Sequence, residues 1–242
     1  MKISLNSLIS TLLIATVIGC KSGAKDYGKS DTATSVKVAG AMKNVMLKGE
    51  LQGTIALDTI SDKTGLYGLG PVDYLKGEIL IIDGKAYKST VVSDTTMLIE
   101  ETFDLRAPFF VYDNKTNWNQ VQLPEGLTGL NELETFLDSI SEEILKPFIF
   151  KLSGMVEEAK IHIQNLPEGS KVSSPQEAHV GQRNYDLIKT EVDIVGFYSR
   201  EHKGIFTHHD TNMHLHLITR DRKAMGHLDK VQFKKGKMQL FY

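Results

Sequence analysis

Histidines alternate with apolar residues in the segment Met213-His214-Leu215-His216-Leu217, and this alternation constrains the fold more than any other feature of the chain. Successive side chains of a β-strand point to opposite faces. His214 and His216 therefore share one face in such a strand, while the methionine and the leucines enter a hydrophobic core. The segment predicts a half-buried β-strand that presents two histidines, one pleat apart, on its second face.

A third histidine follows this pair at the distance of a hairpin return. Ten residues separate His216 from His227, and Gly226 comes directly before His227. Two imidazoles one pleat apart can reach a single ion, and the returning strand can add His227 as a third ligand. Three protein ligands leave one position open, which is typical of catalytic rather than structural zinc sites. The pattern predicts a zinc site formed by His214, His216 and His227.

The histidine pair also has a simpler interpretation. A His-X-His pair on an exposed strand face occurs by chance, and the chain has 8 histidines, so some clustering is expected. A third histidine at hairpin-return distance favours the metal site over this alternative. The neighbouring His208 and His209 are predicted to be loop residues.

Length and composition place the chain among ordinary globular proteins. Its 242 residues suffice for one large domain or for two small ones around a common site. The residues are 41% hydrophobic and 24% charged, and the formal net charge is -2. Because there is no basic excess to attract nucleic acid, we expect no nucleic-acid partner.

The first twenty residues have the pattern of an export signal. Lys2 supplies a positive charge, residues 8–18 form a short apolar run, and Gly19 precedes Cys20, the only cysteine in the chain. The run is too short for a transmembrane helix, and the pattern resembles a bacterial lipoprotein signal in which the cysteine is lipidated. An ordinary signal peptide with an incidental cysteine is the alternative. A single cysteine also excludes intramolecular disulfides and cysteine-based metal sites.

Residues 21–40 are rich in Lys, Ser, Gly, Thr and Asp and lack apolar periodicity. This composition predicts a flexible tether. With a lipidated Cys20, the tether predicts an exported protein that is anchored to a bacterial membrane on its periplasmic or cell-surface side. The membrane is then a partner through the lipid.

The rest of the chain is predicted to hold many strands and few helices. Residues 77–87 predict a hairpin, in which a buried apolar strand meets an Asp83-Gly84 turn and a second strand returns. Residues 131–145 carry apolar side chains at helical spacing and predict an amphipathic surface helix. We further expect a glycine-rich loop at 65–70, strands at 96–105, 109–112, 148–152 and 158–163, a polar loop at 165–182, and several strands over 187–241.

These elements predict an α+β protein in which strands dominate. We expect an N-terminal subdomain over residues 41–150 and a C-terminal β subdomain over residues 151–242. The C-terminal subdomain contains the three candidate metal ligands.

Glu78 stands at the start of an otherwise apolar strand. Charged side chains are rarely buried without a role, because removing an unpaired carboxylate from water is costly. Glu78 is therefore a residue that could have a functional role. The alternative is a carboxylate at the edge of the strand that pairs with a lysine.

Two clusters of motifs, in this order, resemble the alpha-acetolactate decarboxylase family. The family's Gly-Leu-Gly loop and LDGEL-I-LDG-AY run are similar to residues 68–70 and 75–87. The family's GF-(W/Y)-(S/T)-P, HLHF and GGHVLD segments are similar to residues 196–199, 214–217 and 226–229, and the spacing of the histidines matches. The resemblance covers about residues 42–233.

The resemblance implies a zinc enzyme that decarboxylates 2-acetolactate to acetoin. It implies a mixed N-terminal sheet with helices and a C-terminal antiparallel sheet that carries the metal. Members are commonly dimers, so a homodimer is expected. By the match, His214, His216 and His227 correspond to the zinc ligands, and Glu78 corresponds to a glutamate that handles protons.

The sequence also departs from the family. Family members carry an arginine within a run like K-(T/M)-R-(S/T)-(V/I)-P, and here His162 takes its place in the run 160–164. A histidine can donate a proton but cannot clamp a carboxylate through two bonds, so His162 is a candidate catalytic residue of changed role. Arg183 is a candidate for the missing positive charge. The family usually continues beyond the point that corresponds to Tyr242, with a tail that brings another acidic residue to the site.

Three functions therefore stay open from the sequence. The first is an exported, lipid-anchored acetolactate decarboxylase with altered proton-handling groups. The second is a related enzyme for another 2-hydroxy-3-keto acid or a similar metal-chelating ligand. The third is a noncatalytic zinc-binding lipoprotein of the same fold. The histidine triad and Glu78 favour chemistry, whereas the missing arginine and tail favour the second or third function.

Overall fold

The structure, a computed structural model, describes residues 36–144 and 147–242. The predicted signal segment 1–20 with Cys20, and residues 21–35 of the predicted tether, lie outside the described residues. Within the described ranges, no helix has the length and apolar character needed to cross a bilayer.

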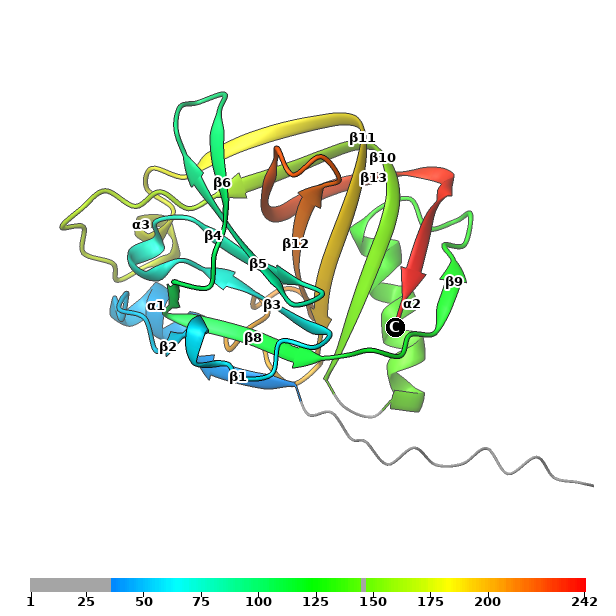
Figure 1. Ribbon diagram of the computed structural model, residues 1–242, viewed down its shortest axis with the longest axis horizontal. Helices are drawn as coiled ribbons and strands as arrows, with labels where there is room; N and C mark the ends of the chain where they lie inside the picture. The colour runs from blue at the N-terminus through cyan, green and yellow to red at the C-terminus, as the bar shows by residue number, and fades with distance from the viewer. Residues whose placement is uncertain (1–35, 145–146) are drawn as a thin grey trace, which may run out of the picture. The chain divides into compact units, whose positions relative to one another are not determined.

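Six strands form the first sheet, in the spatial order β1-β8-β3-β4-β5-β6 (Figure 1). Each pairing between these strands is antiparallel. The predicted hairpin is present as β4 and β5, which are joined at Asp83 and Gly84. The strands are β1 (Lys37–Gly40), β3 (Leu66–Pro71), β4 (Glu78–Ile82), β5 (Lys85–Val91), β6 (Met97–Glu101) and β8 (Phe109–Asn114).

The α+β class is confirmed, but the first sheet is antiparallel rather than mixed. Short links join β3 to β4, β4 to β5 and β5 to β6. A parallel neighbour requires a crossover of a dozen or more residues, so these links permit only antiparallel pairing. The predicted tether also ends earlier than residue 40, because residues 37–40 form β1 and pair with β8 at the edge of this sheet.

The prediction of a glycine-rich loop at 65–70 is wrong, since Leu66–Pro71 is the fully buried strand β3. Its glycines make room for the neighbouring strand β8. A Cβ on Gly68 would lie 2.7 Å from the ring of Phe110, and a Cβ on Gly70 would lie 2.4 Å from the carbonyl oxygen of Phe109. The glycines therefore serve close packing between strands, a use that composition alone cannot separate from a loop.

The second sheet has the order β10-β11-β12-β13-β9, and β13 pairs with β10 as well, so β10, β11, β12 and β13 form a closed ring of strands. All of these pairings are antiparallel, as predicted for the C-terminal sheet. The strands are β9 (Gln120–Gln122), β10 (Phe148–Ile163), β11 (Arg183–Tyr198), β12 (Met213–Thr219) and β13 (Met225–Phe241).

Strand β10 changes the face of its side chains part of the way along. Leu152 and Val156 lie in the same core as Ala159 and Ile161, so the inward positions change from even to odd numbers. The pairing with β13 shifts in register between Val156 and Glu158. An irregularity of this kind sends every later side chain to the opposite face. Consequently the side chain of His162 points away from the core that contains Ile161.

The helices are short, apart from the predicted amphipathic one. Leu133 and Leu137 of α2 (Leu130–Ile144) are fully buried in the core of the second sheet. In Figure 1, α2 lies on the side of β10 away from the six-stranded sheet. The other elements are α1 (Met42–Lys48), α3 (Pro175–Ala178), the 3-10 turns Leu57–Thr59 and Asp73–Leu75, and the pair β2 (Ile55–Ala56) and β7 (Arg106–Ala107).

The two sheets pack face to face through a shared core. Leu69 and Leu80 of the first sheet contact the cluster that contains Val195 and Phe197 of β11. Burial of apolar surface at about 25 cal/mol per Å² makes such a layer the main stabilising contact between the sheets. Strand β10 runs across the predicted subdomain boundary at residue 150, and the division into two subdomains stays a prediction.

Candidate metal centre

Strand β12 presents its histidines as the alternation predicts. Met213, Leu215 and Leu217 lie in the core beneath α2. His214 and His216 lie on the opposite face and are 3% and 0% exposed. The ring of His214 lies 6.2 Å from that of Phe109, so this face of β12 looks towards the first sheet.

Register brings histidines from three strands into one row. His216 lies opposite His227 across β12 and β13, and His227 lies opposite His162 across β13 and β10. Directly opposed residues project to the same face of an antiparallel sheet. The close approach requires glycine at position 226, because a Cβ there would lie 2.4 Å from the carbonyl oxygen of His162.

The three predicted ligands have the spacing of a shared ion. Their ring centroids lie 5.1 Å apart for His214 and His216, 5.0 Å for His214 and His227, and 5.6 Å for His216 and His227. One nitrogen from each ring lies within 4.8 Å of the others. Imidazoles that share a tetrahedral ion, with metal–nitrogen bonds of about 2 Å, place their centroids about 5 Å apart. The residues therefore fit a metal.

The hydrogen bonding of these rings also fits an ion. Nδ1 of His214 and both ring nitrogens of His216 are buried without a hydrogen-bond partner. Leaving a buried polar atom unpaired costs about 1–3 kcal/mol, so such atoms call for a ligand. Burial lowers the pKa of His216 to about 3 and holds the pKa values of His214 and His227 well below the ordinary value. All three are therefore neutral at pH 7, which is the form of imidazole that binds metals.

Glu78 reaches this cluster from the first sheet. Its Oε2 lies 3.6 Å from Nε2 of His216, and its Oε1 accepts a hydrogen bond from the backbone N–H of Gln164 at 3.2 Å. Burial raises the pKa of Glu78 well above its ordinary value; the bond from Gln164 opposes this rise, and the negative charge of Asp229 adds to it. Among the described residues no lysine pairs with Glu78, so the structure does not support the strand-edge alternative.

His162 stands beside the three predicted ligands with a partner of its own. Its ring centroid lies 4.6 Å from that of His227, and its Nδ1 lies 2.8 and 2.9 Å from the two carboxylate oxygens of Asp229. The ligand atoms of His162, His227 and Asp229 also lie within 4.8 Å of one another. His162 and Asp229 satisfy each other's hydrogen bonding. The set of His214, His216 and His227, which contains unpaired nitrogens on His214 and His216, therefore fits a metal better.

Three residues near the centre were not predicted from the sequence. His208 is a loop residue, as predicted, but its ring lies 5.1 Å from that of His227 and 5.9 Å from that of His214. His179 lies 6.2 Å from His162 and lines the same cavity, as does Gln164. Burial is the main cause that lowers the pKa values of His179 and His208. His179 and His208 belong to no spaced motif, so the sequence offered no signal for them. Gln164 ends the run 160–164, in which only His162 was a candidate site residue.

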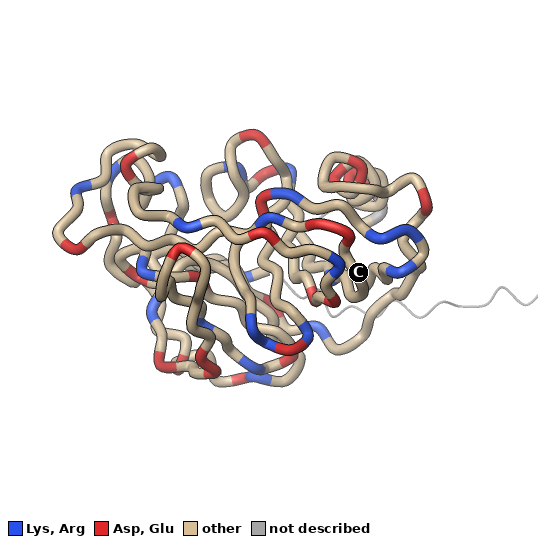
Figure 2. Tube along the Cα trace, turned by 90° about the horizontal axis from the view of Figure 1, so that it is seen from above, with Lys and Arg blue, Asp and Glu red and all other residues tan. Residues whose placement is uncertain are grey.

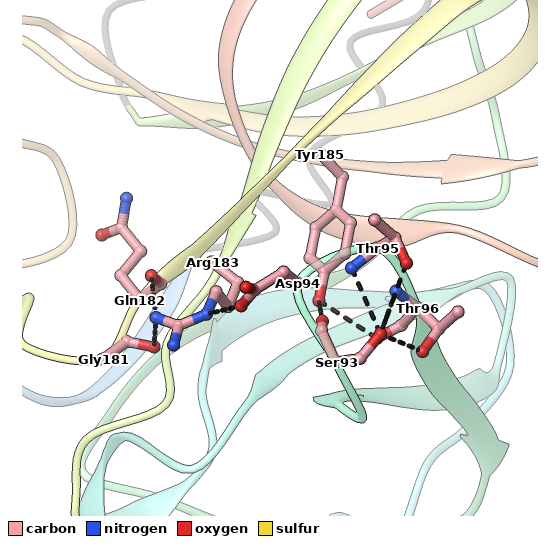
Figure 3. Close-up of polar contacts among 8 residues, drawn as sticks. All are labelled: Ser93, Asp94, Thr95, Thr96, Gly181, Gln182, Arg183 and Tyr185. Atoms are coloured by element: carbon pink, nitrogen blue, oxygen red, sulfur yellow. Dashed lines mark hydrogen bonds and ion pairs between the residues drawn. The ribbon is translucent and has the colours of Figure 1, made fainter.

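Arg183 does not supply the missing positive charge. Its Nε donates to Asp94 at 2.5 Å, and its Nη1 donates to the carbonyl oxygens of Gly181 and Gln182 (Figure 3). Asp94 belongs to the turn between β5 and β6, where Tyr185 also donates to the carbonyl oxygens of Ser93 and Thr96. Arg183 therefore ties a surface turn to the start of β11 and is absent from the lining of the histidine cavity.

The cavity at the centre is small and has an unusual lining. Its volume is about 20 Å³, which is room for about one water molecule. Among the described residues, the lining contains the acid Glu78 and no lysine or arginine. Figure 2 shows that the lysines and arginines of the described residues are interspersed with acidic residues along the trace and do not gather in one cluster. The polar groups that a ligand at the centre meets are therefore histidines, one acid and an amide, and its entry requires side chains to move.

The fold and the site together define a two-sheet α+β protein with a buried three-histidine centre beside a buried glutamate. The model of the family described as alpha-acetolactate decarboxylase matches residues 39–241. The chain belongs to this family, whose members are carboxy-lyases.

Relatives and solved structures agree with this membership. The chain is 24% identical over 193 residues to the alpha-acetolactate decarboxylase of Lactococcus lactis subsp. lactis, covering 76% of this chain and 74% of that one. It is 26% identical over 210 residues to that of Methanosarcina mazei, covering 86% and 69%. The crystal structure of alpha-acetolactate decarboxylase from Bacillus subtilis strain 168 superposes with a TM-score of 0.68 at 21% identity, covering 85% of this chain and 84% of that one.

A Staphylococcus aureus protein of unknown function, similar to alpha-acetolactate decarboxylase, superposes with a TM-score of 0.69 at 17% identity. The superposition covers 86% of this chain and 84% of the Staphylococcus aureus protein. At these identities, the superpositions establish the shared fold.

Proposed function

We propose that this protein decarboxylates 2-acetolactate to acetoin with a zinc ion held by His214, His216 and His227. Family membership supports the reaction. The observation that carries the proposal is the placement of Glu78, whose Oε2 lies 3.6 Å from Nε2 of His216 at the edge of a metal-competent cluster. An acid beside a three-histidine centre is the minimum that this chemistry needs.

The reaction releases carbon dioxide, leaves an enediolate, and adds one proton at carbon to give acetoin. The negative charge that develops on the substrate oxygens must be stabilised. A zinc ion held by the three histidines would act as a Lewis acid towards those oxygens. The proton must come from a group that stays protonated near pH 7 and faces the substrate.

Glu78 is the acid that suits this role. Its burial favours the neutral carboxylic acid, because a charged carboxylate in this apolar layer lacks a cationic partner. The hydrogen bond from the backbone N–H of Gln164 fixes Oε1, which leaves Oε2 towards the histidines. Glu78 is then the group that delivers the proton to carbon and recovers one from solvent after product leaves.

His162 takes the place of the family arginine in a different way. Asp229 accepts the hydrogen of Nδ1, so Nε2 of His162 is free to contact a ligand in the cavity. One imidazole nitrogen cannot make the two parallel bonds of a guanidinium. We propose that His162 orients a substrate oxygen through a single hydrogen bond.

A second candidate substrate follows from the cavity lining. The lining residues of the described chain include no lysine or arginine, whereas acetolactate carries a carboxylate. This observation favours a metal-chelating ligand without a carboxylate as the alternative, because another 2-hydroxy-3-keto acid carries the same carboxylate as acetolactate. Binding without turnover at the same centre is the corresponding noncatalytic function.

We also propose export, with lipid attachment at Cys20 holding the enzyme to a bacterial membrane, and a homodimer as the assembly. The sequence pattern of residues 1–20 supports the anchor. The resemblance to a family whose members are commonly dimers supports the dimer. Labelling of cells with a radioactive fatty acid, with Cys20→Ser as control, tests the anchor. Light scattering of the purified protein tests the dimer.

The reaction is tested by assay of the purified chain. Its metal content is measured, and acetoin formation is followed from racemic 2-acetolactate, with His216→Ala as the control. Acetoin in the wild type and none in the variant supports the proposal. Bound zinc with no acetoin, and no difference from the variant, rejects it. Ligand-dependent thermal stabilisation without product then identifies a binding protein.

A further inference from the structure

The side chain of Gln164 is a buried polar group to which the proposed reaction gives no role. Gln164 follows the end of β10 and lines the histidine cavity. The residue is 4% exposed, and its side-chain Oε1 has no hydrogen-bond partner. An unpaired buried acceptor costs about 1–3 kcal/mol, so the folded chain carries a polar atom that a ligand can satisfy.

The backbone fixes where this side chain begins. The N–H of Gln164 donates to Oε1 of Glu78 at 3.2 Å, so the residue stands directly beside the proposed proton donor. His162 lies two residues earlier and lines the same cavity. Since the bond to Glu78 uses the backbone of residue 164, a change of its side chain leaves that bond in place.

The chemistry of the unpaired atom limits its partner. A carbonyl oxygen accepts hydrogen bonds, so it requires a donor. A carboxylate or keto group cannot serve, whereas a hydroxyl group can. The cavity volume of about 20 Å³ suits a group of that size.

We infer that Gln164 is a specificity-determining residue whose side-chain carbonyl accepts a hydrogen bond from the hydroxyl group of a 2-hydroxy acid bound at the three-histidine centre. This inference rests on the proposed function for the class of ligand. A site that pairs a buried acceptor with a ligand hydroxyl rejects the analogue without that hydroxyl, because the acceptor is then left unpaired.

The test compares two acids that differ in one hydroxyl and that cannot undergo the reaction. Calorimetry measures the dissociation constants of 2-hydroxy-2-methylpropanoate and 2-methylpropanoate for the metal-loaded full chain. The ratio of the two constants is compared between wild type and Gln164→Met, which keeps the length of the side chain and removes the acceptor. Gln232→Met makes the same change at an exposed position of β13 and is the matched control.

We expect the preference for the hydroxy acid to fall about tenfold in Gln164→Met, equivalent to about 1.4 kcal/mol, and to stay unchanged in Gln232→Met. Gln164→Asn shortens the side chain by one methylene group and so moves the carbonyl away from the ligand. It should lose the preference as well, and it replaces the methionine variant in the test if that variant fails to fold. An unchanged ratio in a folded variant overturns the inference, and so does a wild type that binds both acids equally.

The acetoin assay on the same wild-type preparation separates this inference from the proposed reaction. Hydroxyl preference that depends on Gln164, without acetoin, leaves the inference standing and rejects the reaction. Acetoin formation with no dependence of the preference on Gln164 rejects the inference alone.

Discussion

Nδ1 of His162 lies within 2.9 Å of both carboxylate oxygens of Asp229. His162 is therefore held by a neighbouring strand, because Asp229 belongs to β13 and His162 to β10. The pairing fixes which nitrogen carries hydrogen and leaves the other for a ligand. Two residues that act as one unit should show strongly non-additive effects when replaced.

The first prediction concerns this unit. His162→Ala and Asp229→Asn should each lower kcat/KM about tenfold or more, and the double variant should be no worse than His162→Ala alone. Steady-state kinetics on the four proteins, with metal content measured in each, provides the check. Additive losses would show that Asp229 acts independently of His162.

The second prediction concerns the metal ligands. His216→Ala should lose stoichiometric zinc, and chelation should lower the melting temperature of the wild type towards that of the variant. A ligand present at a hundred times its dissociation constant stabilises a fold by about 2.7 kcal/mol. His209→Ala, at an exposed loop position, is the control and should retain zinc. Elemental analysis and thermal unfolding supply the data, and a His216 variant with full zinc would refute the ligand assignment.

The third prediction concerns Glu78. Glu78→Gln should lower kcat about 10²- to 10⁴-fold, because the amide cannot deliver a proton. Its metal content should not change, and its thermal stability should not fall, since the amide oxygen still accepts the bond from the backbone N–H of Gln164 and the amide places no charge in the buried layer. Glu101→Gln, at an exposed position of β6, should behave as wild type. Full activity in Glu78→Gln would remove this residue from the mechanism.

The fourth prediction concerns Arg183. Its ion pair with Asp94 is exposed at the surface, so Arg183→Gln should leave kcat and KM unchanged and shift the free energy of unfolding by no more than about 0.5 kcal/mol. Kinetics and urea unfolding measure the two quantities. A large rise in KM would instead place this guanidinium at the substrate.

The fifth prediction concerns pH and the attachment of α2. Arg200 donates to Oδ1 of Asp138 at 2.7 Å and Tyr198 donates to the same oxygen; these bonds lower the pKa of Asp138 below its ordinary 3.8. A carboxyl with a lowered pKa stabilises the fold fully above pH 3.8 and loses that contribution as the pH falls through the lowered value. Asp138→Asn should therefore be slightly less stable than wild type at pH 6, with a difference that shrinks below about pH 4. Urea unfolding at both pH values measures it, and a constant difference would contradict the assignment.

Local periodicity made much of the fold predictable. The alternation around His214 and His216, the Asp83-Gly84 turn and the helical spacing of residues 131–145 each lie within one element, and each is present in the structure. The prediction of a loop at 65–70 was wrong because the conformation of this segment depends on contacts with another element. Its glycines are needed because the backbone of Phe109 and the ring of Phe110 pack against them, and these residues belong to another strand about forty residues away in the sequence.

By itself, the sequence determined the strand that presents His214 and His216, the return of His227, and the membership of the family, because these depend on spacing along the chain. The tertiary structure alone decided what surrounds them. The register shift in β10 turns His162 towards His227, and the pairing of β13 with β10 places Asp229 against it. The packing of the two sheets brings Glu78 and Gln164 to the same cavity. Those contacts join residues far apart in the chain, and their energies exist only after the sheets have closed and excluded water.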